Sequence, residues 1–337
     1  MAQPTPASEW MHRLLDLGRD VRAALIASRG RGEELAAPVT HEGGDTIYAI
    51  DRRVEPIIER HARGWAQACG GVELIAEGMG DSGVRRFGDA VSPPAFRVII
   101  DPIDGTRNIM YDKRSAWFLG AVVPGAAGDL SHAVASVMVE LPTSKAGWAD
   151  EFGATRDGDT FSERVGLLGQ PPQSMHCRAS TAPDLRHGFG QVANFFPGTK
   201  RLAADLMEQI AAATLGAVEP GSASVFDDQY ISSGGQFVEL LCGRDRFCCD
   251  LRPLFYRVLQ RETGQTVRGL ECHPYDAAGL LVAQRHGVIV TDGLGQPLTP
   301  PLDVHSPVHW CGYANPRLRA AIEPVIQQFF RDRGVTA

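Results

Sequence analysis

The sequence predicts a mixed α/β fold, built as one large domain or about two domains. The chain has 337 residues and a mass of 36.4 kDa, and a typical domain has about 150 residues. Segments with helical periodicity alternate with short apolar runs that are typical of strands. Apolar residues make up 44% and charged residues 22% of the chain, which excludes a disordered or repetitive protein.

Two helices are expected near the N-terminus. Residues 8–28 form the first, because Ser8 can cap it and apolar residues recur at helical spacing as far as Gly30. Residues 51–67 form the second, with apolar and charged side chains on opposite sides. Pro56 lies close enough to the start of this helix to be tolerated.

Short apolar runs then predict strands. Residues 72–76 and 96–100 are apolar on both faces and are followed by Glu77 and Asp101. Alternating patterns predict further strands over residues 116–123 and 133–140, and an exposed hairpin over residues 147–153 with its turn at 156–159.

The second half of the chain begins after residues 166–173, where two Gly and two Pro mark a boundary. This boundary separates an N-terminal α+β half, 1–165, from a C-terminal α/β half, 174–337. Residues 234–269 carry no assignable pattern. The other expected elements are a helix over 199–214, a strand near 218, a helix after 222, a turn and helix over 273–287, a strand over 288–292 and a helix over 316–330.

Charge and apolar patterning exclude several classes of protein. The 33 basic and 40 acidic side chains give a formal net charge of −7, so no basic surface for a nucleic acid is expected. No apolar run approaches the about 20 residues of a membrane helix, and the N-terminus has no secretory signal pattern. The seven cysteines contain no CxxC pair, which favours neither disulfides nor zinc and fits a reducing cytoplasm.

The most informative run follows the strand at residues 96–100. That strand delivers Asp101 to its carboxyl end, Pro102 fixes the turn, and Asp104 follows, so both carboxylates can face one point. Carboxylates gathered at a strand end suit Mg²⁺ bound together with a substrate phosphate. Gly105 permits close approach of the backbone, and Thr106 offers free amides to a phosphate. For this run alone an acidic turn is the commoner interpretation, and the rest of the chain favours the metal site.

Two motifs decide between these interpretations. DPIDGTRN spans residues 101–108, and residues 275–298 match much of the pattern WDxAAGxLIVxxxGGxVTDxxGxPL. With these motifs the sequence resembles the inositol monophosphatase family, in the wider group of metal-dependent, lithium-sensitive sugar phosphatases that includes fructose-1,6-bisphosphatase. Weaker matches extend the resemblance over roughly residues 10–330. The resemblance implies a five-layered αβαβα sandwich with the active site between its two halves.

The resemblance also implies roles for individual residues. Two or three Mg²⁺ ions would be held by Glu77, Asp101, the Ile103 carbonyl, Asp104 and Asp276. Glu77 would hold the metal that activates water, and Thr106, hydrogen-bonded to Asp51, would orient that water and help to deprotonate it. The amides of Gly105 and Thr106 would cradle the phosphate, and substrate hydroxyls would meet Asp104, Gly221, Ser222 and Ala223. On local evidence Asp51 and Ser222 could each be a helix cap instead.

Three features depart from the family pattern. Gly78 stands where the family usually has a second acid, which would loosen one metal site. Arg107 replaces a small polar residue and either reaches a second anionic group of the substrate or pairs with Asp112. The chain between Ser222 and Asp276 is about twice the usual length, so the family's substrate-side acid is not mapped among the candidates Glu239, Asp245, Asp250 and Glu271.

The sequence therefore predicts a Mg²⁺-dependent phosphoric monoester hydrolase for a small phosphorylated cyclitol or sugar. A 3′-phosphonucleotide or sugar bisphosphate phosphatase is the alternative if Arg107 binds a second phosphate. A third hypothesis, motivated by Gly78 and the long segment, is a catalytically impaired protein that binds metal or ligand for regulation. The resemblance further implies a homodimer, and the net charge and the short apolar runs predict neither a nucleic acid nor a membrane as a partner.

Overall fold

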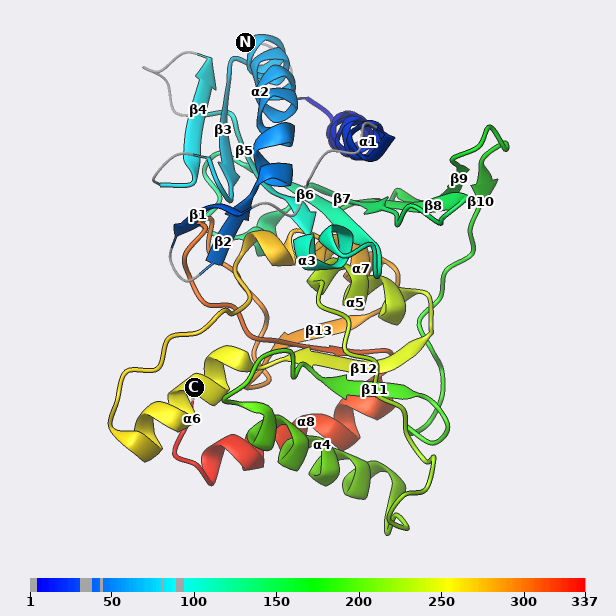
Figure 1. Ribbon diagram of the computed structural model, residues 1–337, viewed down its shortest axis with the longest axis vertical. Coiled ribbons are helices and arrows are strands. Elements are labelled where there is room, and N and C mark those ends of the chain that lie inside the picture. The colour runs from blue at the N-terminus through cyan, green and yellow to red at the C-terminus, as the bar shows by residue number, and fades with distance from the viewer. Residues whose placement is uncertain (1–4, 31–37, 43–44, 80–81, 89–93, 337) are drawn as a thin grey trace.

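Helices and sheets of this protein stack in five layers, in the order helix, sheet, helix, sheet, helix (Figure 1). The computed structural model describes residues 5–30, 38–42, 45–79, 82–88 and 94–336, and for residues 38–42 and 45–52 it describes the backbone alone. A small hairpin of β1 (Pro38–Glu42) and β2 (Asp45–Tyr48) precedes the layered part. No helix in these ranges combines the length and the apolar character needed to cross a membrane.

The first two layers are a pair of long helices and an eight-stranded sheet. Helices α1 (Ala7–Gly30) and α2 (Ala49–Cys69) cover one face of this sheet. Its strand order is β10-β9-β8-β7-β6-β5-β3-β4. Strands β3 and β5 pair in parallel, and every other pair of neighbouring strands in this sheet is antiparallel. The strands are β3 (Gly71–Ala76), β4 (Val84–Gly88), β5 (Phe96–Asp104), β6 (Ala116–Pro124), β7 (Ala135–Leu141), β8 (Trp148–Thr155), β9 (Thr160–Gly166) and β10 (Gln173–Ser174).

The middle layer lies between the two sheets. It contains α5 (Ser233–Leu241), the short 3-10 helix η2 (Tyr275–Ala277) and α7 (Leu280–Arg285). These elements contact β6, β7 and β8 on one side and β12, β13 and β14 on the other. Because helices cover both faces of the central strands, every residue of β6 except Pro124 is buried.

The last two layers are a four-stranded sheet and its outer helices. The strand order is β11-β12-β14-β13, with β11 and β12 parallel. Helices α4 (Lys200–Leu215) and α8 (Pro316–Arg331) pack together beyond this sheet. The strands are β11 (Phe189–Val192), β12 (Asp245–Asp250), β13 (Ile289–Asp292) and β14 (Trp310–Tyr313), and three short helices complete the chain, α3 (Thr106–Met110), η1 (Leu130–His132) and α6 (Arg252–Thr263).

Two hydrophobic cores hold the layers together. One lies between α1, α2 and the eight-stranded sheet and includes Trp10, Leu14 and Val98. The other joins the opposite face of that sheet to the middle layer, the four-stranded sheet and the outer helices, and includes Phe237 and Trp310. The layered αβαβα sandwich expected from the sequence is therefore confirmed.

Three elements differ from the sequence prediction. Strand β8, expected in an exposed hairpin, is almost entirely buried, because α1 and α7 cover its two faces. No strand forms near Val218, which lies in an exposed connection. The helix expected after residue 222 begins only at Ser233, and the unassigned segment 234–269 holds most of α5, β12 and α6. The proposed boundary at 166–173 lies between β9 and β10, which still pair with each other.

Candidate active site

Three carboxylates converge where β5 meets the middle layer. Among the described residues, Asp101, Asp104 and Asp276 each offer a ligand atom, and these atoms lie within 4.8 Å of one another. Asp101 and Asp104 come from the end of β5, whereas Asp276 comes from η2. Asp101 and Asp104 are only 4% exposed, so the cluster is largely removed from water.

A bulge in β5 allows its two acids to face one point. Residues three apart in a regular strand point to opposite faces of the sheet. Asp101 pairs with Leu119 on β6 and Asp104 pairs with Trp117, so β5 contains one residue more than β6 over this stretch. This extra residue restores Asp104 to the side of Asp101. The Ile103 amide donates to Asp101 Oδ1 at 2.9 Å and fixes the turn between the two acids.

The N-terminus of α5 holds the Asp104 carboxylate. Asp104 accepts hydrogen bonds from Ser232 Oγ at 2.7 Å, from the Ser233 amide at 3.2 Å and from the Gly234 amide at 2.6 Å. Amides in the first turn of a helix have no partner within the helix, and the helix dipole favours negative charge there. Ser232 also caps α5 by accepting from the Gly235 amide at 2.9 Å.

Two glycines permit this close packing. A Cβ atom on Gly234 would lie 2.5 Å from Leu119 Cδ2 and 3.0 Å from Asp104 Oδ2, so only glycine lets the amide reach the carboxylate. Gly105 has φ of 90°, and a Cβ there would lie 2.9 Å from the Ile231 carbonyl. Both the positive φ and the close approach therefore require glycine after Asp104.

Asp276 is oriented by its own turn. The His273 amide donates to Asp276 Oδ2 at 2.6 Å, and His273 Nδ1 lies 3.9 Å from the same oxygen. On the other side of η2, Ser136 Oγ from β7 donates to the Ala278 carbonyl at 2.5 Å, and both groups are buried. Asp276 is thus fixed relative to the eight-stranded sheet that carries the other two acids.

The electrostatics of the cluster favour a bound cation. Burial raises the pKa of Asp104 to about 6, although hydrogen bonds from Ser232, Gly234 and Ser233 act in the opposite direction. Burial and the neighbouring carboxylates raise the pKa values of Asp101 and Asp276 well above the usual range. Three neighbouring acids that repel one another, two of them buried, fit a hard divalent cation, which takes oxygen ligands and neutralises their charge.

Glu77, another expected metal ligand, is exposed and is not among the three acids whose ligand atoms lie within 4.8 Å of one another. Glu77 directly follows β3, whose parallel pairing with β5 sets Ala76 beside Ile100 at the same edge of the sheet. Its charge contributes to the raised pKa values of Asp101 and Asp276, after the effect of burial. Gly78 after it has φ of 75°, a conformation that an acidic side chain would adopt at a cost.

Thr106 begins α3, and its hydroxyl donates to the Ile103 carbonyl at 2.9 Å. Its expected partner Asp51 lies in the first turn of α2, with a side chain outside the described residues. The pairing of Thr106 with Asp51 therefore stays a prediction.

The expected substrate contacts at residues 221–223 lie in an exposed loop. The Ser222 amide donates to the Glu219 carbonyl at 3.0 Å, and Ser222 Oγ lies 2.7 Å from Ser224 Oγ. The described hydrogen bonds of Ser222 thus stay within the loop, and a substrate role for Gly221, Ser222 and Ala223 remains a prediction. The structure instead brings Ser232, Ser233 and Gly234 to Asp104.

Sequence reasoning missed these three residues, although a signal was present. Ser233 precedes Gln236 by three residues, immediately before the apolar run that begins at Phe237. This spacing is the capping-box pattern of a helix start, within one residue of the actual cap Ser232. The two glycines between them lowered the apparent helix propensity.

Two arginines and an aromatic pair stand beside the cluster. Arg107 from α3 and Arg252 from the start of α6 lie 5.8 and 5.6 Å from the ring centre of Phe196, and Arg252 also lies 5.1 Å from that of Phe195. The charge of Arg252 acts on both Asp104 and Asp276. Of the four candidate substrate-side acids, Asp250 binds this arginine, at 2.5 to 3.0 Å.

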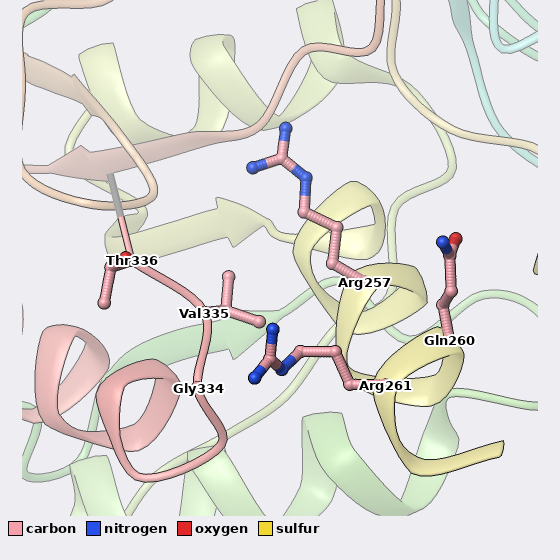
Figure 2. A pocket seen from close by; sticks show the side chains of 6 residues that line it. All are labelled: Arg257, Gln260, Arg261, Gly334, Val335 and Thr336. Carbon is pink, nitrogen blue, oxygen red and sulfur yellow. The ribbon is translucent and has the colours of Figure 1, made fainter. Parts of the chain in front are cut away.

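A surface cavity of about 370 Å³ lies elsewhere, between α6 and the C-terminal residues (Figure 2). Two guanidinium groups from successive turns of α6 stand at this cavity, and none of the clustered acids lines it. It is therefore separate from the candidate active site. The cavity is lined by Arg257, Gln260, Arg261, Gly334, Val335 and Thr336.

Comparisons with known proteins agree with the fold. No protein-family model and no curated protein matches the chain. The extragenic suppressor protein SuhB from Bartonella henselae is 18% identical, with 94% of this chain and 98% of that chain covered and a TM-score of 0.63. Fructose-1,6-bisphosphatase from Leishmania major is 13% identical, with 98% and 96% covered and a TM-score of 0.64.

A third similar structure comes from Pyrococcus horikoshii. It is a hypothetical protein described by its similarities to inositol-1 monophosphatase, 14% identical, with 96% of this chain and 98% of that chain covered and a TM-score of 0.61. At these identities the likeness establishes the fold alone. The fold is thus the one shared by inositol monophosphatase-like proteins and fructose-1,6-bisphosphatase.

Proposed function

We propose that this protein is a metal-dependent phosphomonoesterase that acts on a small phosphorylated cyclitol or sugar. The observation that carries the proposal is the convergence of Asp101, Asp104 and Asp276, from two separate layers, into one acidic cluster. The fold supports the proposal, because the chain shares it with a fructose-1,6-bisphosphatase and with a protein described by its similarities to inositol-1 monophosphatase. Mg²⁺ is the proposed ion, because oxygen donors of this kind suit it.

The chain's own residues would position the ion and the substrate. Asp101, Asp104 and Asp276 would hold Mg²⁺, with Glu77 and the Ile103 carbonyl as further ligands. Bound there, the ion would neutralise charge on the phosphoryl oxygens and make a water molecule nucleophilic. The amides of Gly105 and Thr106 would contact the phosphate, and α5 would keep Asp104 ionised and oriented through its first-turn donors.

Phosphate release from a panel of inositol, sugar and nucleotide phosphates tests the proposal. We expect turnover of one group of compounds with Mg²⁺, none with a chelator, and inhibition by Li⁺. Turnover that persists in the chelator would contradict the metal-dependent mechanism. Binding of Mg²⁺ without turnover of any compound would instead support the regulatory binding protein that the sequence left open.

The Asp104→Asn variant tests the assignment of the site. It removes one charge and one proposed ligand oxygen, so kcat is expected to fall by at least about 100-fold, because metal stabilisation of the transition state is worth several kcal/mol. Circular dichroism should show an unchanged fold. As a matched control, Asp129→Asn changes an acid that caps η1 away from the cluster, and it should leave kcat unchanged. Near-normal activity of Asp104→Asn would refute the site.

A second candidate function rests on Arg107, which follows Asp104 by three residues and lies against Phe196. An arginine at this place would bind a second anionic group, as a sugar bisphosphate or 3′-phosphonucleotide carries. Arg107→Ala should then lower kcat/KM for a bisphosphate about 10-fold or more beyond its effect on a monophosphate. Equal effects on both substrates would exclude this role, and Arg285→Ala on α7 is the control.

A further inference from the structure

Two partly buried cysteines from distant parts of the chain are in contact. Cys177 Sγ and Cys242 Sγ lie 3.0 Å apart, although 65 positions separate them in the sequence. A disulfide bond has an S–S distance of about 2.05 Å, so the two sulfurs need to approach by only about 1 Å. Neither cysteine is fully buried, so a small oxidant has access to this pair.

The other five cysteines differ from this pair. Cys249 and Cys311 face each other across β12 and β14 but are 0% and 1% exposed in the middle of the four-stranded sheet. Cys248 and Cys272 are likewise fully buried. Cys69 is partly buried, but its thiol contacts the Gly71 carbonyl at 3.7 Å. Accessibility and a thiol neighbour therefore coincide at Cys177 and Cys242.

The charges around the pair favour reaction at Cys177. The hydrogen bond from the Cys242 thiol lowers the pKa of Cys177, and Arg244 and Arg164 act in the same direction against burial and Asp150. A thiol with a lowered pKa is the better nucleophile near neutral pH, because the thiolate is the reacting species. Cys177 would thus attack first and Cys242 would resolve the intermediate.

We propose that Cys177 and Cys242 are a reversible redox-modification site, which forms an intramolecular disulfide when it reacts with a low-molecular-weight disulfide such as glutathione disulfide. The Cys177 thiolate attacks one sulfur of glutathione disulfide, which forms a mixed disulfide and releases one glutathione thiolate. The Cys242 thiol then loses its proton and attacks the Cys177 sulfur, which releases the second glutathione. Two protein thiols are oxidised, and one glutathione disulfide is reduced to two glutathione molecules.

The bond would join the connection between the two sheets to α5. Cys177 follows β10, the last strand of the eight-stranded sheet, and the Ser180 and Ala182 carbonyls beyond it accept from Asn315 Nδ2 at 2.9 and 3.0 Å. Cys242 caps the C-terminal end of α5, whose other end holds Asp104. A disulfide here closes a long loop and restricts the unfolded chain, so we expect Tm to rise by about 5 °C.

Thiol counting on the full-length protein in glutathione buffers tests the proposal. After acid quenching, unfolding and alkylation, the reduced protein should show its seven thiols. The oxidised protein should show two fewer, with a linked peptide pair containing Cys177 and Cys242 in the mass spectrum. Dithiothreitol should restore all seven. The oxidised protein should also melt about 5 °C higher than the reduced protein.

Three variants control the experiment. Cys177→Ser and Cys242→Ser should form no intramolecular disulfide and show no rise in Tm on oxidation. Cys69→Ser removes the other partly buried thiol and should lose two thiols on oxidation, as the wild type does. The proposal is overturned if the wild type keeps seven thiols, if the lost thiols map to other cysteines, if a glutathione adduct persists without an internal bond, or if Tm does not change. None of these readouts depends on phosphatase activity.

Discussion

At the scale of single residues, the acidic cluster opposes folding until a cation binds. Burial raises the pKa values of Asp101, Asp104 and Asp276, and repulsion by neighbouring carboxylates adds to this for Asp101 and Asp276, so the ionised forms are less stable in the folded than in the unfolded chain. The metal-free folded protein therefore holds more protons than the unfolded protein from about pH 4 upward. The contribution of these acids to the stability of the metal-free folded protein therefore falls as the pH rises through the folded pKa of Asp104, which is about 6.

Replacing Asp101 by Asn tests this opposition. The variant keeps an oxygen that can accept from the Ile103 amide but removes one of the repelling charges. At pH 7.5 the metal-free variant should be more stable than the metal-free wild type by about 1 kcal/mol or more, since one pKa unit corresponds to about 1.4 kcal/mol. Urea unfolding with and without Mg²⁺ measures this. Mg²⁺ at 100 times its Kd should stabilise the wild type by about 3 kcal/mol and should stabilise the variant far less. If the metal-free variant is less stable than the metal-free wild type, the prediction is contradicted.

Binding of Mg²⁺ should depend on pH in the direction that the raised pKa values dictate. Ligand carboxylates must lose their protons before they coordinate a metal. Below the Asp104 pKa of about 6 the ion competes with at least one proton, so its affinity should fall by about tenfold or more per pH unit as the pH is lowered in this range. Calorimetric titration between pH 5 and pH 8 in buffers of different ionisation enthalpy measures affinity and proton release. A pH-independent affinity would show that the cluster is not the binding site.

At the scale of elements, the start of α5 shows how packing can reverse a helix propensity. Alanine normally stabilises a helix interior by about 1 kcal/mol relative to glycine. At Gly234 the added methyl group would overlap Leu119 and crowd the Asp104 carboxylate. Gly234→Ala should therefore destabilise the protein by about 1–3 kcal/mol and weaken Mg²⁺ binding.

Gly64 in α2 is the matched control for this substitution. A Cβ atom at Gly64 would meet nothing within 4 Å, and the residue is exposed. Gly64→Ala should accordingly stabilise the protein by about 0.5–1 kcal/mol and leave Mg²⁺ binding unchanged. Thermal unfolding of both variants gives the comparison. If Gly234→Ala stabilised the protein as well, the close approach of α5 to Asp104 would be wrong.

At the scale of the whole molecule, the site exists only because two layers are held together. Ser136 on β7 donates to the buried Ala278 carbonyl, two residues beyond Asp276. Ser136→Ala removes that bond and leaves a buried carbonyl unpaired, at an expected cost of about 1–2 kcal/mol. Because Asp276 is then less firmly placed beside Asp101 and Asp104, Mg²⁺ affinity should fall about tenfold.

Ser162→Ala is the matched control for the whole-molecule test. Ser162 on β9 also joins the eight-stranded sheet to α7, since its Oγ lies 2.8 Å from His286 Nε2. This contact is remote from the cluster, so the variant should keep Mg²⁺ affinity within about twofold even if it unfolds more easily. Unchanged Mg²⁺ affinity in Ser136→Ala would show that Asp276 is positioned by other contacts.

Local sequence by itself determined the helices at both ends of the chain and the strands around β5, and the two motifs together identified Asp101 and Asp104 as the core of the candidate site. These features depend on periodicity, turn residues and a motif of neighbouring residues, which interactions within a short stretch of chain define. The burial of β8 and the start of α5 at Ser233 could not be obtained in this way, because neighbouring layers decide them.

Only the tertiary structure decided which distant groups meet. The family resemblance groups Asp276 with the acids of β5, but no sequence pattern indicates that Ser232 to Gly234 hold Asp104 or that Cys242 reaches Cys177, contacts that span 65 or more positions of the chain. The physical reason is that such contacts arise when whole layers pack together to bury apolar area. The spacing of the contacting residues along the sequence carries no signal of this packing. The one-residue bulge that turns Asp104 toward Asp101 belongs to the same class, since it is defined by the partner strand β6.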